Sequence, residues 1–356
     1  MTCGSYSIDL AERKSERSTK SHELTPKQIR VYFGRFSGSF PNWHLFQVKK
    51  CELVLQKELA DLYNYLLNPS TPKSTVASSS SSTARVITAV VALPILIASI
   101  LIPKLSLMFV LLAVAAMVVA LSEFWLLVGR RGVKADFAAG YLGSAGLFSV
   151  FYFVEPHSWP DLLMIEIILI VLTMGTLTAA MLRGAPFDKM IASVGATLLG
   201  VMYIGLLGGH LVATRTGFKE PLSAHLLSFF FMVLMGGDTA AYYVGRAVGK
   251  HKLAPKVSPG KTWEGAIGGM CASLLMAVLA HLWFFRELPL KWAVGLAAVM
   301  NVLGVLGDLT ESALKRGADA KDAANILPGH GGLLDRLDSL LFNAPLIYYF
   351  ARIYFG

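Results

Sequence analysis

The residues best suited to chemistry lie between positions 312 and 338, just ahead of the last apolar segment of the chain. This stretch combines carboxylates, lysine, arginine, histidine and glycines, and long apolar segments lie on both sides of it. Ionisable groups at a membrane are costly unless they face protein, water or a ligand, so their clustering indicates a functional site. Carboxylates beside Lys and Arg suit a metal-assisted reaction on a polyphosphate, because the acids hold the cation while cation and bases neutralise phosphate oxygens.

Acidic side chains lie at helical spacing at the end of this stretch and just ahead of it. Asp335 and Asp338 are three residues apart, so both can converge on one side of a helix. The preceding run 328–332, Pro-Gly-His-Gly-Gly, cannot be regular helix, and two oxygen donors from each side of such a turn would suit Mg²⁺. His330 is either a general acid or phosphate hydrogen-bond donor, or a structural turn residue. Four further side chains would share one helix face, as a site or as a surface ion-pair ladder: Asp308, Glu311, Ser312 and Lys315.

A second polar stretch, residues 237–265, precedes another apolar segment. It begins with Asp238 in an otherwise apolar run and contains Ser-Pro-Gly-Lys-Thr at positions 258–262, at the expected start of a helix. A hydroxyl, a glycine and a lysine at a helix N-terminus suit phosphate binding. A P-loop is excluded, because Pro255 occupies the position of the earlier glycine and we expect no preceding strand. A merely basic loop would explain the lysines but not Asp238, so phosphate binding is favoured.

Residues 312–338 carry a resemblance to a known family. They read Ser-x-Leu-Lys-Arg-x4-Lys-Asp-x-Ala-x2-Leu-Pro-x-His-Gly-Gly-Leu-x-Asp-Arg-Leu-Asp, which resembles the signature of the phosphatidate cytidylyltransferases, or CDP-diacylglycerol synthases, without departure over these 27 positions. The stretch 237–265 resembles the family's second motif. The resemblance covers roughly residues 86–356 and does not extend to residues 1–85.

The resemblance implies the reaction of CTP with phosphatidate to give CDP-diacylglycerol and pyrophosphate. It also implies Mg²⁺, a second cation such as K⁺, and a homodimer. Asp308 and Asp335 would be the metal ligands, with Asp338 or Asp322 in support. The implied catalytic residues are Asp308, Asp335, Lys315, Arg316 and His330. The implied substrate-binding residues are Asp238, Ser258, Lys261, Thr262, Ser312, Lys321, Asp322 and Arg336.

Three other kinds of membrane protein share some of these features. A CTP-dependent lipid kinase of the polyprenol or phytol type would use the same membrane, nucleotide and metal, but its product would be a lipid phosphate. A CDP-alcohol phosphotransferase would need an Asp-Gly-x2-Ala-Arg run followed by two spaced aspartates, which the sequence lacks. A transporter would hold its charges near the bilayer midplane in broken helices. Here the charges concentrate at one face, which favours an interfacial enzyme.

Long apolar segments must position these residues, and each approaches the ~20 residues that a helix needs to cross hydrocarbon. We expect an all-α, polytopic integral membrane protein with about nine transmembrane helices, or eight or ten because the first and last segments are short. The predicted spans are 86–102, 105–128, 136–154, 161–182, 190–213, 225–247, 264–285, 291–307 and 339–355.

Residues 1–85 form a polar extension, with 12 Lys and Arg against seven Asp and Glu, and end in a Ser- and Pro-rich linker. A basic segment ahead of membrane spans is typical of a cytoplasmic juxtamembrane region, so we expect membrane lipid rather than nucleic acid as its partner. The chain therefore divides into this extension and a transmembrane cytidylyltransferase domain, residues 86–356.

The distribution of basic residues predicts the orientation. Lys and Arg concentrate in the loops after the second, fourth, sixth and eighth predicted spans, which the positive-inside rule places in the cytoplasm. All the dense polar motifs then lie on the cytoplasmic face, where CTP and the cytoplasmic lipid leaflet are accessible. We expect the bacterial inner membrane, with a plastid membrane as the alternative.

Overall fold

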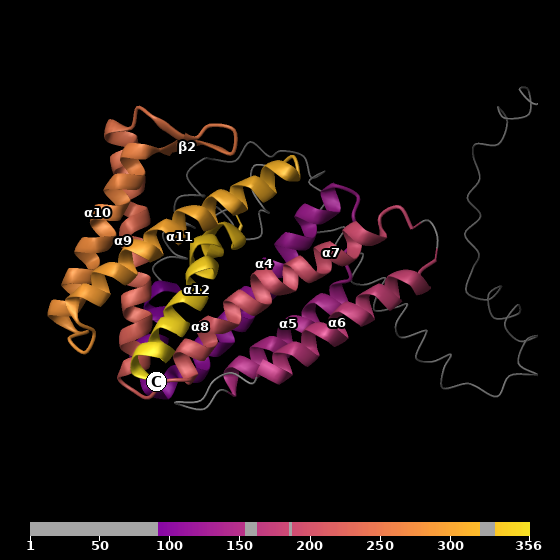
Figure 1. Cartoon of the computed structure of the whole chain (residues 1–356), viewed down its shortest axis with the longest axis horizontal. Coiled ribbons are helices and arrows are strands. Elements are labelled where there is room, and N and C mark those ends of the chain that lie inside the picture. Colours follow the sequence, from indigo (N-terminus) through magenta and orange to yellow (C-terminus); the bar gives the residue numbers. More distant parts are fainter. Residues whose placement is uncertain (1–91, 154–161, 185–186, 321–331) are drawn as a thin grey trace, which may run out of the picture. The chain divides into compact units, whose positions relative to one another are not determined.

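The computed structural model describes residues 92–153, 162–184, 187–320 and 332–356 (Figure 1). These residues all belong to the second of the two units into which the chain divides, Ala77–Gly356. The predicted extension, residues 1–85, lies outside the described residues, and its role and boundary stay predictions.

The described chain is a bundle of helices. In order they are a short helix Ala92–Leu101, the 3-10 turn η1 (Pro103–Leu105), α4 (Ser106–Arg130), α5 (Phe137–Tyr152), α6 (Leu162–Leu182), α7 (Met190–Gly200), the π-helical η2 (Val201–Leu206), α8 (Leu207–Thr216), α9 (Leu222–Val248), α10 (Trp263–Trp283), α11 (Leu290–Gly317) and α12 (Leu334–Phe355). The segments α7, η2 and α8 follow one another without a break.

Among the described residues, six helices are long and apolar enough to cross a membrane. They are Pro103–Arg130, Leu162–Leu182, Met190–Thr216, Leu222–Val248, Trp263–Trp283 and Leu290–Gly317. Ala92–Leu101 and α5 are apolar but shorter, and α12 is not among the six. The helices confirm an integral membrane protein, while the predicted number of about nine spans remains a prediction. Each predicted span nevertheless coincides with all or part of a described helix.

The structure agrees with the all-α prediction and adds one element that the sequence did not predict, because two short strands form a hairpin between α9 and α10. Strand β1 (Lys252–Ala254) pairs antiparallel with β2 (Ser258–Thr262). The predicted absence of a strand before the helix was therefore wrong. The Ser-Pro-Gly-Lys-Thr run forms β2 and ends at Thr262, the N-cap of α10, so it does lie at the start of a helix. Pro259 and Gly260 disfavour helix in this run, and the Glu264 carboxylate fixes the hairpin by accepting the backbone N–H groups of Lys250 and His251.

The helices that carry the two polar stretches pack tightly against each other. In Figure 1, α9 and α10 lie side by side, and the hairpin extends from their ends near α11. A Cβ on Gly265 of α10 would lie 2.7 Å from the Ala241 carbonyl oxygen of α9, so this approach depends on glycine. Helix α12 has a buried central face, with Ala344, Ile347 and Tyr348 fully covered. It contacts α11, α8, α9 and α4, so the helix is held from several sides.

Candidate active site

Three carboxylates from three helices gather beside one lysine from the hairpin. Asp238 lies on α9, Asp308 on α11 and Asp338 on α12, and we call them the carboxylate site. The Lys261 Nζ at the end of β2 is 2.5 Å from Asp308 Oδ2, and the charges of Asp238 and Asp308 both act on Asp338. The Ser339 hydroxyl donates to Asp238 Oδ2 at 3.4 Å and so links α12 to α9.

Glycine allows α11 and α12 to meet closely at this site. A Cβ on Gly307 would lie only 2.6 Å from the Asp338 carbonyl oxygen, so a larger residue could not be accommodated without displacing backbone. Gly307 immediately precedes Asp308 in the sequence. The close approach therefore places the neighbouring Asp308 and the Asp338 backbone at the same level of the bundle.

Asp338 is strongly perturbed by its surroundings. The residue is 6 % exposed and lies ahead of residue 339, outside the six candidate spans. Burial, followed by repulsion from Asp308 and Asp238, raises the pKa of the Asp338 carboxyl to about 7. A hydrogen bond from the Ser339 N–H at 2.6 Å and the nearby Lys261 oppose that rise. A group of carboxylates that repel one another is an environment that favours a bound cation.

A second charged group lies around Lys315 of α11. The Lys315 ammonium is 2.7 Å from Glu311 Oε2 and 2.8 Å from Asp335 Oδ1 of α12. Asp335 Oδ2 also accepts the Gly332 N–H at 3.3 Å. Burial alone would raise the pKa of Asp335, but interactions with Glu311, Lys315 and Gly332 outweigh it and hold that pKa below its usual value. Glu311 is almost completely buried, so this is an internal ion-pair cluster and not a surface ladder.

The structure thus divides the predicted acidic residues between two groups. Asp335 is engaged by Lys315, whereas Asp338 belongs with Asp308, so the two aspartates of α12 interact with different neighbours. The Ser312 hydroxyl points to Asp308 Oδ1 at 3.5 Å, in agreement with the predicted shared helix face.

Other predicted residues have structural contacts of their own. The Thr262 hydroxyl caps α10 by accepting the Gly265 N–H at 3.1 Å. Arg316 donates from Nε to the Val257 carbonyl at 3.3 Å, which ties the hairpin to α11. Ser258 pairs with Ala254 in the hairpin. Arg336 lies in the first turn of α12, next to Asp335. Lys321, Asp322 and His330 lie outside the described residues.

Two residues near these groups were not predicted from the sequence. Glu123 of α4 is fully buried and accepts the N–H groups of Leu333 and Leu334 at 2.8 and 2.7 Å. Tyr203 in the π-helical η2 is buried, and the charges of Asp338, Glu311 and Asp308 act on its hydroxyl, for which the described residues provide no hydrogen-bond partner. A carboxylate in the apolar run 106–128 was the available signal for Glu123, whereas nothing in the sequence distinguishes Tyr203.

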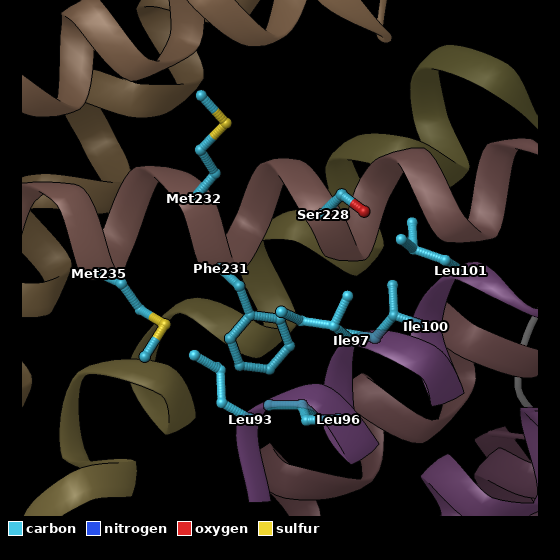
Figure 2. Close-up of a pocket in the computed structure, with 9 residues that line it drawn as sticks. All are labelled: Leu93, Leu96, Ile97, Ile100, Leu101, Ser228, Phe231, Met232 and Met235. Atoms are coloured by element: carbon cyan, nitrogen blue, oxygen red, sulfur yellow. The ribbon is translucent and has the colours of Figure 1, made fainter. Parts of the chain in front are cut away.

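An apolar groove lies between α9 and the short helix Ala92–Leu101 (Figure 2). Its volume is about 250 Å³, and the short helix Ala92–Leu101 forms the opposite wall. Of the residues of α9 that line the groove, Met235 is the last in sequence. Asp238 follows three positions later, about 4.5 Å further along the helix axis and on the same face. The groove is lined by Leu93, Leu96, Ile97, Ile100, Leu101, Ser228, Phe231, Met232 and Met235.

The helices are long and apolar enough to cross a membrane, and carboxylates and lysines gather where α9, α11, α12 and the hairpin meet. These features define an integral membrane protein with a charged site. Residues 83–354 match the model of the cytidylyltransferase family, and the chain belongs to that family. It is therefore an enzyme of the nucleotidyltransferase class, as the motif at 312–338 predicted.

Bacterial relatives agree with this assignment. A phosphatidate cytidylyltransferase of Bacillus subtilis (strain 168) is 38 % identical over 187 residues, which are 52 % of this chain and 66 % of the relative. The enzyme of the same name from Staphylococcus saprophyticus is 33 % identical over 263 residues, or 74 % and 96 % of the two chains. That of Staphylococcus aureus (strain COL) is 34 % identical over 264 residues, with the same coverage. These similarities confirm the predicted family.

Proposed function

We propose that this chain transfers the cytidylyl group of CTP to phosphatidate, giving CDP-diacylglycerol and pyrophosphate. The names of the bacterial relatives support the substrates. The observation that carries the proposal is the meeting of Lys261, Asp308, Asp238 and Asp338 from four elements at one end of an apolar bundle. Such a site suits a reaction between a water-soluble polyanion and a membrane lipid.

The chemistry needs no strong base, because the nucleophile is already an anion. A phosphate oxygen of phosphatidate forms a bond to the α-phosphorus of CTP, while the bond from that phosphorus to the bridging oxygen of the β-phosphate breaks and pyrophosphate leaves. The obstacle is repulsion between two highly charged phosphates, so positioning and charge neutralisation supply most of the rate. Lys261 and Lys315 are the ammonium groups paired with these carboxylates, and Lys261 would become available to phosphate oxygens if Asp308 held a cation.

The donor set fits Mg²⁺. Within the described ranges no three acidic, histidine or cysteine side chains are arranged closely enough to hold a metal ion alone. Mg²⁺, however, is commonly bound by one or two carboxylates together with substrate phosphates and waters. Asp308 and Asp338 would be those carboxylates, with Asp238 beside them, and the bound ion would supply charge neutralisation of the phosphates. Asp335, which the family resemblance also implies as a ligand, would first have to leave Lys315.

The groove beside α9 offers a route for the lipid. Its lining is apolar apart from Ser228, and on α9 the lining ends at Met235, three residues before Asp238. An acyl chain in this groove would bring a phosphate headgroup towards the carboxylate site from within the membrane. The distribution of Lys and Arg supports a cytoplasmic location for this end of the bundle, and the bacterial relatives support the inner membrane.

The test uses detergent-purified protein with CTP labelled with ³²P at the α-phosphorus, together with phosphatidate and Mg²⁺. Transfer of label into organic-extractable lipid that requires both phosphatidate and Mg²⁺ is the expected result. Transfer only from γ-labelled CTP to a lipid alcohol would identify a CTP-dependent lipid kinase instead. Failure of both reactions with folded protein would overturn the proposal.

A further inference from the structure

Glu123 is a carboxylate buried in an apolar helix, and its side-chain hydrogen bonds go to the start of α12. The residue is fully covered, and both of its oxygens accept hydrogen bonds from consecutive backbone N–H groups at the start of α12. The donors, Leu333 and Leu334, lie 210 and 211 positions further along the chain. A buried carboxylate in a membrane segment is expensive, so these contacts need a specific explanation.

The start of α12 has no capping side chain at its N-cap position. The first N–H groups of any helix lack partners within the helix, and the N-cap position here is Leu333, whose side chain has no hydrogen-bonding group. The three consecutive N–H groups of Gly332, Leu333 and Leu334 are all bound by carboxylates, the first by Asp335 and the other two by Glu123. The negative charge of Glu123 also interacts favourably with the positive end of the helix dipole.

The anchored residues are adjacent to the site. Asp335 follows Leu334 directly and faces Lys315, and Asp338 is one helical turn further and faces Asp308. The position and rotation of the first turn of α12 therefore determine where both carboxylates point. An error of about 1 Å in such a position costs on the order of 100-fold in rate for a reaction that depends on positioning.

We propose that Glu123 is a positioning residue: its carboxylate anchors the first turn of α12 and thereby holds Asp335 and Asp338 in the catalytic arrangement. This inference rests on the proposed function for the location of the site, but the anchor itself is independent of it. The hydrogen bonds of Glu123 go to Leu333 and Leu334 and not to Asp308, Asp338 or Lys261, so we place its action through α12 and not on substrate.

The test compares Glu123→Gln with the wild type and with Ser122→Ala. A glutamine has nearly the same shape but only one acceptor oxygen, so one of the two N–H groups loses its partner. Ser122 is the neighbouring residue on α4 and bonds instead to Val118 and Tyr141, which makes it a matched control. Glu123→Asp retains the charge and both acceptors on a shorter side chain, and serves as the conservative variant.

Two measurements separate positioning from general stability. Hydrogen exchange of the peptide covering residues 332–337 should be about tenfold faster in Glu123→Gln, since a hydrogen bond to a charged group is lost there, while exchange in α9 and α10 stays unchanged. The kcat of the CTP-dependent reaction should fall about tenfold or more, with the KM for CTP within about twofold, and Glu123→Asp should recover part of kcat.

Either of two results would overturn the inference. Unchanged exchange at residues 332–337 would show that Glu123 does not anchor α12. Faster exchange with an unchanged kcat would show that the anchor does not set the catalytic arrangement. Failure of the proposed function has a different result, because wild-type protein would then form no CDP-lipid while the exchange measurement would still report on the anchor.

Discussion

Asp308 interacts with each of the other charged residues of the carboxylate site. Its two oxygens are engaged by Lys261 from the hairpin and by Ser312 from the next turn of α11. Its charge also acts on Asp238 and Asp338 of two other helices. A change of charge at this position therefore affects every member of the carboxylate site.

We expect Asp308→Asn to reduce kcat by about two to three orders of magnitude, as removal of a single group that stabilises developing charge commonly does. The variant should stay folded, because asparagine has the same shape and the side chain is partly exposed. Without substrate, Mg²⁺ should raise the thermal unfolding temperature of the wild type, since a ligand that binds only the folded state stabilises it. That rise should be absent in Asp308→Asn.

The matched control is Asp319→Asn. Asp319 lies shortly after α11, is 78 % exposed at its side chain and pairs with Arg131 at the surface. It has the same charge as Asp308 without contact to the carboxylate site, so its activity and its response to Mg²⁺ should equal those of the wild type. Full activity of Asp308→Asn would contradict the metal assignment.

At the scale of elements, the site depends on the contact between α11 and α12. Gly307→Ala should destabilise the protein by about 1–3 kcal/mol and lower kcat, because the new methyl group would overlap the Asp338 carbonyl and displace backbone. Gly295→Ala is the control on the same helix, since nothing lies within 4 Å of a Cβ there. That variant should be more stable by about 0.5–1 kcal/mol, as alanine favours helix, and its kcat should stay unchanged. Thermal unfolding and CDP-lipid formation distinguish the two.

The elements also show how far sequence reasoning extends. Apolar runs locate the helices, because membrane spans need long continuous hydrophobicity. The predicted span 291–307 lies within α11, which continues to Gly317 with polar residues on a face that contacts protein. The hairpin at residues 252–262 was missed because its strands are three and five residues long and lack apolar alternation. Which aspartate faces which lysine depends on helix rotation, and Glu123 contacts a segment 210 residues away, which no local pattern encodes.

At the scale of the whole described unit, the apolar groove and the carboxylate site both include residues of α9. The groove residues Ser228, Met232 and Met235 recur at intervals of three and four and share one face, on which Asp238 follows. A phospholipid has the same sequence of parts, with an apolar chain joined to an anionic headgroup. If an acyl chain of phosphatidate occupies the groove during the reaction, then the size of the groove must influence which acyl chains are accepted.

Met235→Trp tests this relation, because the larger ring would fill the groove next to Asp238. We expect the KM for long-chain phosphatidate to rise about tenfold while activity on a short-chain, water-soluble phosphatidate stays within about twofold. A tenfold rise in KM corresponds to the loss of burial of one or two methylene groups of the acyl chain, at about 0.8 kcal/mol each. Met174→Trp provides the control, since Met174 is an exposed methionine of α6 that does not line the groove. Equal effects on both chain lengths would show that Met235→Trp disturbs the site itself, and no effect on either would exclude the groove as the lipid route.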